Sequence, residues 1–81
     1  MDDIQIHHRI TALIQAEHEL RAKVASGEIS SAQERAELKA TEEALDQCWD
    51  LLRQRQARRQ YGQNPDDAAV RPVSEVEGYQ Q

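Results

Sequence analysis

Hydrophobic residues recur along the first third of the chain with the spacing of an amphipathic helix. If Glu17 is included, the steps alternate between four and three residues, as in the a/d seam of a coiled coil. Asp2 or Asp3 can cap the start of this helix, where acidic charge also suits the helix dipole. The pattern predicts a helix from about Asp3 to Ala25. Its apolar positions are Ile6, Ile10, Leu13, Leu20 and Val24.

A second amphipathic segment follows after a short connection. Gly27 predicts the end of the first helix, because glycine readily adopts the left-handed conformation found at helix ends. Ser31 stands three residues before Glu34, which is the spacing of a capping box. These signals predict a second helix from about Ala32 to Tyr61. Its seam consists of Leu38, Thr41, Leu45, Cys48 and Leu52.

The short connection predicts that the two helices pack antiparallel as a hairpin. In the register that the connection favours, the numbers of facing residues sum to about 58, so that Ile10 faces Cys48. The same register places Glu17 opposite Thr41. We interpret Glu17 and Thr41 as a polar core layer that fixes the register, or as a carboxylate bonded across a dimer axis. A small shift of the helix would alternatively let Glu17 reach water.

The apolar surface of the hairpin is wider than its seam. Several large side chains are expected to face outward or to lie at its margin. Two hairpins related by a two-fold axis would bury these side chains in an antiparallel four-helix bundle. We therefore predict an all-α protein in which residues 1–62 form a hairpin that dimerises. The predicted interface residues are Ile14, Trp49, Leu51 and Leu52.

Residues 63–81 form an acidic tail of different composition. The segment from Asn64 to Asp67 predicts a turn or a one-turn helix with proline near its start. Ser74 and Glu77 have capping-box spacing, which predicts a helical turn over Glu75–Gln80. Three apolar residues of the tail are expected either to dock on the hairpin or to bind a partner protein. They are Val73, Val76 and Tyr79.

The composition and length of the chain argue against a large enzyme, a membrane protein and a secreted protein. The 81 residues are 38% hydrophobic and 31% charged, with a net charge of −5. A chain of this size has no room for a large enzyme core, and it contains no apolar run of the roughly 20 residues that span a bilayer. The acidic first residues do not have the basic character of a secretory signal. We expect a cytoplasmic protein without cofactor or membrane association.

The sequence offers few candidates for catalysis or metal binding. The predicted register buries Cys48 and places no histidine beside it, although a nucleophile needs a base within hydrogen-bond reach. Three scattered glycines form no phosphate loop. Glu17 and His18 are candidate ligands of a metal-carboxylate bundle, but the Glu-x-x-His motif of such bundles is missing. The sequence thus predicts no enzyme and keeps a metal site as a lower alternative.

Four arginines lie close together near the end of the second helix. Such cations suit the negative end of the helix dipole and can attract the acidic tail. Alternatively they form a nucleic-acid patch, although the chain is acidic and no aromatic residue is interleaved for base stacking. The four are Arg53, Arg55, Arg58 and Arg59.

The chain resembles a small actinobacterial family known as domain of unknown function 2630. The resemblance is carried by the run from Leu45 to Arg55 with the following Ala57-Arg58-Arg59. Further matching segments are Met1-Asp2-Asp3, Glu17-His18 with Leu20-Arg21, Val70-Arg71-Pro72-Val73 and Val76-Glu77-Gly78-Tyr79. It implies an actinobacterial, cytoplasmic source and no catalytic residue. We predict a non-enzymatic homodimeric interaction or adaptor protein, with nucleic-acid binding and the metal-carboxylate bundle as alternatives.

Overall fold

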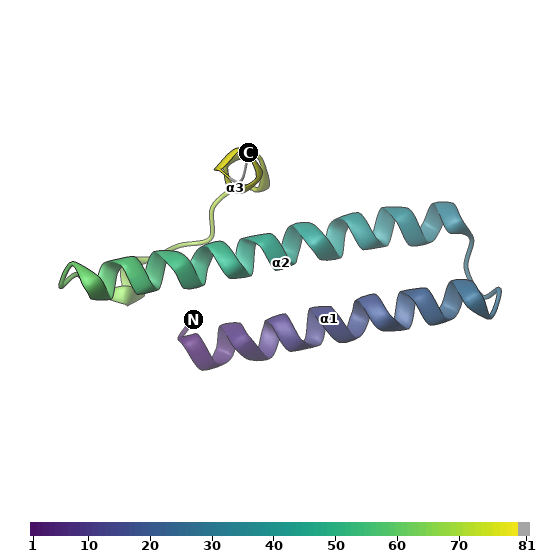
Figure 1. Ribbon diagram of the computed structural model, residues 1–81, viewed down its shortest axis with the longest axis horizontal. Helices are drawn as coiled ribbons and strands as arrows, with labels where there is room; N and C mark the ends of the chain where they lie inside the picture. Colours follow the sequence, from purple (N-terminus) through teal and green to yellow (C-terminus); the bar gives the residue numbers. More distant parts are fainter. Residues whose placement is uncertain (80–81) are drawn as a thin grey trace.

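The computed structural model describes residues 1–79, which are helical throughout apart from the connections. Helix α1 (Asp3–Ala25) and helix α2 (Ser31–Gln60) form the hairpin, followed by the 3-10 turn η1 (Pro65–Asp67) and the short helix α3 (Val73–Tyr79). Figure 1 shows α1 and α2 antiparallel, with α3 crossing α2 on the side away from α1. The predicted all-α hairpin is confirmed. None of the helices described is long and apolar enough to cross a membrane.

Both long helices begin with a capping box. In α1 the Asp2 carboxylate accepts from the Gln5 backbone N–H, and the Gln5 side chain accepts from the Asp2 N–H. In α2 Ser30 and Gln33 make the same two bonds. The prediction of a Ser31 cap was therefore wrong by one residue. The reason is that Ser30 and Gln33 offer the same reciprocal bonds one residue earlier.

Both long helices also end in the same way. Gly27 and Gly62 adopt positive φ values of 78° and 70°. After α1 the N–H of Glu28 donates to the carbonyl of Lys23, and after α2 the N–H of Gln63 donates to that of Arg58. This is the Schellman arrangement, in which a left-handed residue lets the chain satisfy the last carbonyls and turn away. The predicted helix stop at Gly27 is confirmed.

The hydrophobic core lies in the half of the hairpin that contains the N-terminus. Ile6 and Ile10 of α1 pack with Cys48 and Leu51 of α2, and four partly buried side chains surround them. These four are Leu13, Leu45, Leu52 and Ala68. The cluster joins the layers that the predicted register places opposite one another. Leu51 was expected to face outward, and this was wrong: it is buried in the cluster with Ile6 and Ile10, against which Ala68 of the tail also packs.

The tail returns along α2 instead of leaving the hairpin. Asn64 caps η1 by accepting from the Asp66 N–H, as the sequence predicted. Helix α3 begins at Val73, so Ser74 lies inside it and does not cap a turn that starts at Glu75. Val76 is buried and Val73 half-buried. The predicted end of this turn at Gln80 and the side chain of Tyr79 lie outside the described residues.

Candidate interaction site

A polar stripe on α2 holds the tail in place. Its members recur every three or four residues and thus lie on one face of the helix. The Gln54 amide donates to the carbonyl of Ala69 at 2.8 Å, and the Gln47 amide donates to that of Arg71 at 3.2 Å. Between them, the Asp50 carboxylate binds the guanidinium of Arg71. The extended segment before α3 is therefore fixed through both its backbone and its side chains.

Asp50 is the most buried polar residue described, with 1% of its surface exposed. Arg71 Nε donates to Asp50 Oδ2 at 2.9 Å, a second nitrogen of the guanidinium binds Oδ1, and Gln54 also donates to Oδ2. The hydrogen bonds from Arg71 hold the pKa of Asp50 below its ordinary value, although burial opposes this. Asp50 in turn raises the pKa of Arg71. A buried carboxylate is tolerated here because all of its partners are supplied.

A second ionic cluster joins the start of α1 and the C-terminal part of α2 to the tail. Arg55 is 6% exposed, and its Nε donates to Asp3 Oδ1 at 2.6 Å. Its Nη1 donates to the carbonyl of Pro65 at 3.1 Å and to Asp66 Oδ1 at 3.0 Å. Arg59 binds the other oxygen of Asp3 at 2.7 Å. Hydrogen bonds from Arg59 and then Arg55 lower the pKa of Asp3, and Asp3 and Asp66 raise the pKa of Arg55.

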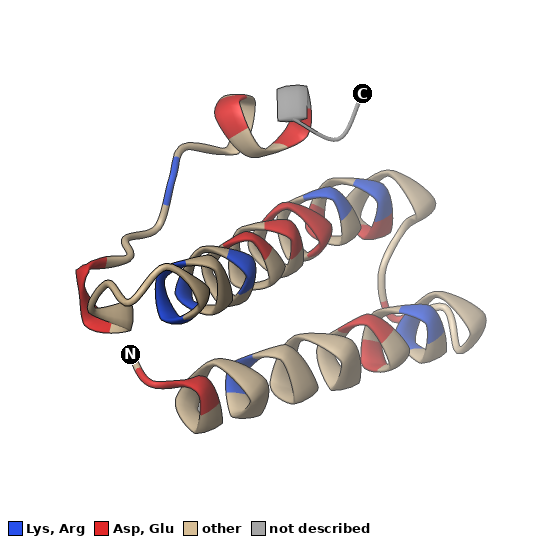
Figure 2. Ribbon diagram, turned by 60° about the vertical axis from the view of Figure 1, so that its left-hand side comes forward, with Lys and Arg blue, Asp and Glu red and all other residues tan. Residues whose placement is uncertain are grey.

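The four arginines of the predicted patch are thus distributed around α2. Arg55 pairs with Asp66 of the acidic tail, as the structural interpretation of the sequence expected. The pairing of Arg55 and Arg59 with Asp3 at the start of α1 was not expected. Arg53 is exposed and Arg58 is half-buried. Figure 2 shows acidic residues in the middle of α2 and arginines towards its C-terminal end. Nucleic-acid binding through these arginines stays a prediction, and this arrangement does not favour it.

One edge of the hairpin carries exposed apolar side chains. Trp49 and Ile14 are each 42% exposed, and Leu52 is half-buried. The His7 ring lies edge-on to Trp49, with 6.4 Å between the ring centroids. Ile14 follows His7 by seven residues, two turns along the same side of α1. A hollow of about 280 Å³ lies beside Trp49, lined in part by His7, Leu52 and Arg53.

A smaller hollow of about 210 Å³ lies on another side of the hairpin. Ile6, Cys48 and Leu51 form its floor, while Met1, Arg9 and Val70 contribute to its lining. Cys48 is buried, as the sequence predicted. A buried thiol of this kind packs as a small hydrophobic group.

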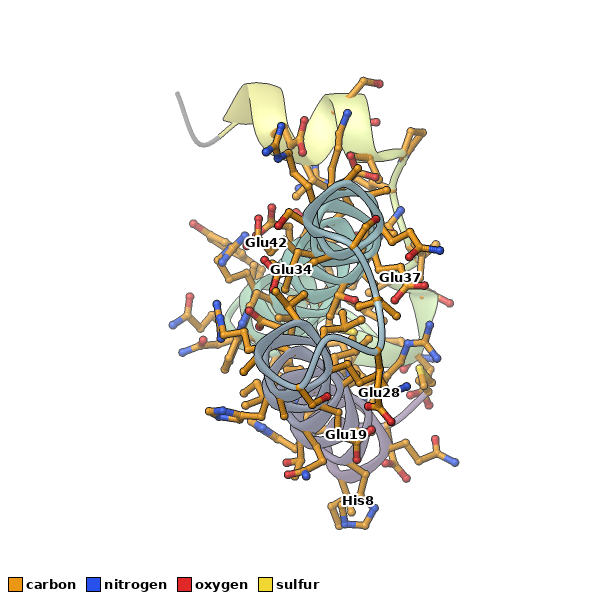
Figure 3. All side chains as sticks on the ribbon, turned by 90° about the vertical axis from the view of Figure 1, so that its right-hand side faces the viewer. His8, Glu19, Glu28, Glu34, Glu37 and Glu42 are labelled. Carbon is orange, nitrogen blue, oxygen red and sulfur yellow. The ribbon has the colours of Figure 1, made fainter. Side chains whose placement is uncertain are left out.

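Glu17 and Thr41 are both partly buried within the hairpin. The Glu17 carboxylate lies 3.5 Å from Arg21, one turn further along α1, and the Thr41 hydroxyl donates to the carbonyl of Glu37. His18 is exposed. Figure 3, which looks along the hairpin from its loop end, shows His8 pointing away from it. Over residues 1–79, no three His, Cys, Asp or Glu side chains are grouped to hold a metal ion.

Comparison with known proteins identifies the chain. A family model described as protein of unknown function (DUF2630) matches residues 2–81. The chain belongs to this family. An uncharacterized protein of Mycobacterium tuberculosis and one of Mycobacterium bovis are each 51% identical to it over 70 residues, which cover 86% of this chain and 80% of each relative. No solved structure matches. The resemblance seen in the sequence is thus confirmed, and DUF2630 carries no assigned activity.

Sequence reasoning missed the tail clamp of this DUF2630 protein, which consists of Gln47, Asp50, Gln54 and Arg71. One signal could have found it. Gln47, Asp50 and Gln54 are polar residues on the side of α2 away from its seam, at the spacing of a single helical stripe. Arg71 stands before a proline, where the chain is held extended and its carbonyl is left without a helical partner. The polar stripe of α2 and the extended segment at Arg71 thus both carry hydrogen-bonding groups that could have indicated their pairing.

Proposed function

We propose that this DUF2630 protein is a non-enzymatic interaction protein that acts as a homodimer. The exposed edge of the hairpin carries this proposal. Trp49 is 42% exposed even though tryptophan gains more than other side chains from burial, and Ile14, two turns from His7 along α1, is equally exposed. Tryptophan is enriched among the residues that dominate binding energy at protein interfaces. A second hairpin packed on this edge would complete a four-helix bundle.

The thin shape of the hairpin supports the same proposal. The chain measures 51 × 26 × 15 Å, so that α1 and α2 form a single layer. A single layer of two helices has a small core, and association is a common way for such small domains to bury more apolar surface. The tail covers the side of α2 near Asp50 and leaves the Trp49 edge open.

The titratable groups support a structural role over a catalytic one. Among the residues described, the groups whose pKa departs clearly from its ordinary value are Asp3, Asp50, Arg55 and Arg71. Each is engaged in an ion pair that joins segments distant in the sequence. Ion-pair networks with this purpose shift pKa values without any catalytic function.

Sedimentation velocity over the micromolar concentration range tests the dimer. We expect a reversible monomer–dimer equilibrium, and a blue shift of the Trp49 fluorescence as the concentration rises. Trp49 is the only tryptophan, so the signal reports directly on this edge. Trp49→Ala and Ile14→Ala should each weaken the dimer at least tenfold, which is about 1.4 kcal/mol.

Matched controls are available on the same helices. Tyr61→Ala removes an aromatic side chain that is 80% exposed at the end of α2, and Ile4→Ala removes an isoleucine that is 68% exposed on α1. Both should leave the dimer unchanged. A wild-type chain that stays monomeric at the highest concentration, while retaining its helix content, would contradict the proposed function.

A further inference from the structure

Three consecutive residues of α2 face three different surroundings. Successive residues of an α-helix are about 100° apart around its axis. Cys48 is buried in the core against α1, and Asp50 is buried against the tail. Trp49 lies between these two directions and is 42% exposed. The Trp49 side of α2 is therefore left partly open by α1 and the tail, although the His7 ring of α1 lies against Trp49.

A line of residues runs along the Trp49 side of α2, and all of them except Trp49 are charged or polar. Its residues follow one another at steps of four, three, four and three, the a/d spacing with which two helices pack side by side. Acidic residues precede Trp49 on this line, and a basic residue follows it. We call this set the Trp49 stripe. It consists of Glu42, Asp46, Trp49, Arg53 and Gln56.

We propose that a second copy of the chain packs on the Trp49 stripe with its α2 antiparallel, and that the two-fold axis passes beside Trp49. This geometry rests on the homodimer proposed above and specifies how the two copies meet. It places Trp49 of one copy against Trp49 of the other, because the numbers of facing residues then sum to 98 or 99. By the same relation Asp46 faces Arg53, and Glu42 faces Gln56, each twice in a symmetric dimer.

Charge selects this orientation of the two helices. In the antiparallel arrangement Asp46 and Arg53 attract each other across the axis, whereas a parallel two-fold pair would place like charges together, which costs free energy. Neither Asp46 nor Arg53 forms an ion pair within residues 1–79 of its own chain. Both charges are thus available to a second copy.

The hollow beside Trp49 gives the partner helix a place to bind. Arg53, Gln56 and Arg59 line it on α2, and His7 lines it on α1. Asp3 also lines the hollow and forms an ion pair with Arg59, so the antiparallel arrangement directs Asp46 of the second copy to Arg53. A polyphosphate fits the stripe less well, because the acidic half with Glu42 and Asp46 would repel it.

Charge reversal tests the arrangement. Asp46→Arg and Arg53→Asp should each raise the dimer Kd at least tenfold, because each creates two like-charge contacts across the axis. A mixture of the two variants should form a heterodimer with nearly the wild-type Kd, since both cross pairs are then Arg with Asp. The double variant should dimerise with itself equally well. Native mass spectrometry distinguishes the heterodimer when one variant is isotopically labelled.

Two control variants change the charge by the same amount at positions of α2 outside the Trp49 stripe. Glu37→Arg reverses an exposed acid that Figure 3 shows on the opposite side of α2 from Glu42. Arg58→Asp reverses a cation close to the same helix end as Arg53. Neither should change the Kd by more than about threefold, since charges outside a contact contribute little. Circular dichroism of every variant checks that the helices are retained.

The outcomes separate this geometry from the homodimer itself. A wild-type dimer whose Kd is unaffected by both single reversals would overturn the geometry and leave the proposed function standing. A wild-type monomer would overturn both. If Arg53→Asp abolishes binding of a DNA duplex at low salt and leaves the dimer unchanged, the stripe binds phosphates and our proposal is wrong.

Discussion

The guanidinium of Arg71 binds the carboxylate of Asp50, and this contact joins the C-terminal tail to the middle of α2. The two side chains differ in exposure: that of Asp50 is 2% exposed and that of Arg71 is 31% exposed. The difference has an energetic consequence. Removing Arg71 leaves a buried charge without its partner, whereas removing the Asp50 charge leaves a guanidinium that water can reach.

The first prediction concerns this asymmetry. Arg71→Met should release residues 68–79 from α2, because Asp50 then regains hydration only if the tail moves away. Loss of one partner of a buried pair costs about 3–5 kcal/mol, and release of the tail limits this loss. Asp50→Asn removes the carboxylate charge but leaves Gln54, which binds both position 50 and the backbone of the tail. This variant should therefore release the tail less than Arg71→Met does. Hydrogen exchange of the tail amides measures the release of the tail in both variants. Glu75→Gln is the control, because it removes only the weaker 3.4 Å contact between Glu75 and Arg71. Greater release by Asp50→Asn would contradict the argument.

The second prediction is that the protein loses stability at acidic pH. The pKa values of Asp3 and Asp50 are lowered from the ordinary 3.8 by their arginine partners. A carboxylate with a lowered folded-state pKa stabilises the fold fully above its unfolded pKa, and this stabilisation is lost as the pH falls through the folded value. The melting temperature, followed by circular dichroism, should therefore be independent of pH near neutrality, where both carboxylates stabilise the fold fully, and should fall steeply below pH 3.8. Asp50→Asn should flatten this fall, and an unchanged pH profile would refute the role of Asp50.

The third prediction concerns the geometry of Arg55. This side chain binds Asp3, Asp66 and the carbonyl of Pro65 in directions that a planar guanidinium can satisfy together. A lysine retains the charge but cannot reproduce this fork. Arg55→Lys should cost about 2 kcal/mol, because hydrogen bonds to charged groups are lost. For a chain of this size the melting temperature should fall by about 8–16 °C.

Arg35→Lys is the matched control for Arg55→Lys. It exchanges the same residue types on the same helix at an exposed position. Surface substitutions of this kind change stability by less than about 0.5 kcal/mol. Equal melting temperatures for the two variants would show that Arg55 acts only through its charge.

The fourth prediction locates the core. Ile6 is fully buried, whereas Ile4 on the same helix is 68% exposed. Ile6→Ala should destabilise the chain by about 2–5 kcal/mol, because it removes apolar contacts and leaves a cavity. Ile4→Ala should change stability by less than about 0.5 kcal/mol. Urea unfolding of both variants makes the comparison, and similar midpoints would place the core elsewhere.

The helices and their pairing could be predicted because their signals are local or periodic. The seam from Ile6 to Val24 repeats on a single face, and Gly27 supplies the left-handed residue that a helix end requires. The outward orientation expected of Leu51 failed for a different reason. Whether a residue at the margin of a seam is covered depends on how the segments around it pack, and Leu51 is buried in a cluster to which α1, α2 and Ala68 of the tail all contribute.

The tail clamp shows why the candidate site was harder to predict than the fold. Arg71 could pair with any of several acids along α2, and each such pair has a similar Coulomb energy at a water-exposed surface. The pairing with Asp50 is selected by the neighbouring Gln47 and Gln54, which fix the path of the backbone. Such a selection requires α2 and the tail to be positioned relative to each other at several residues at once.

By itself, the sequence determined an all-α chain of two antiparallel amphipathic helices, its helix stop at Gly27 and its membership of DUF2630. These properties follow from residues near one another along the chain or from a regular repeat. Only the tertiary structure decided that the tail returns to α2, that Arg55 joins Asp3 to Asp66, and that Trp49 is left on an open side. The physical reason is that burial and ion pairing depend on distances between segments that the order of residues does not contain.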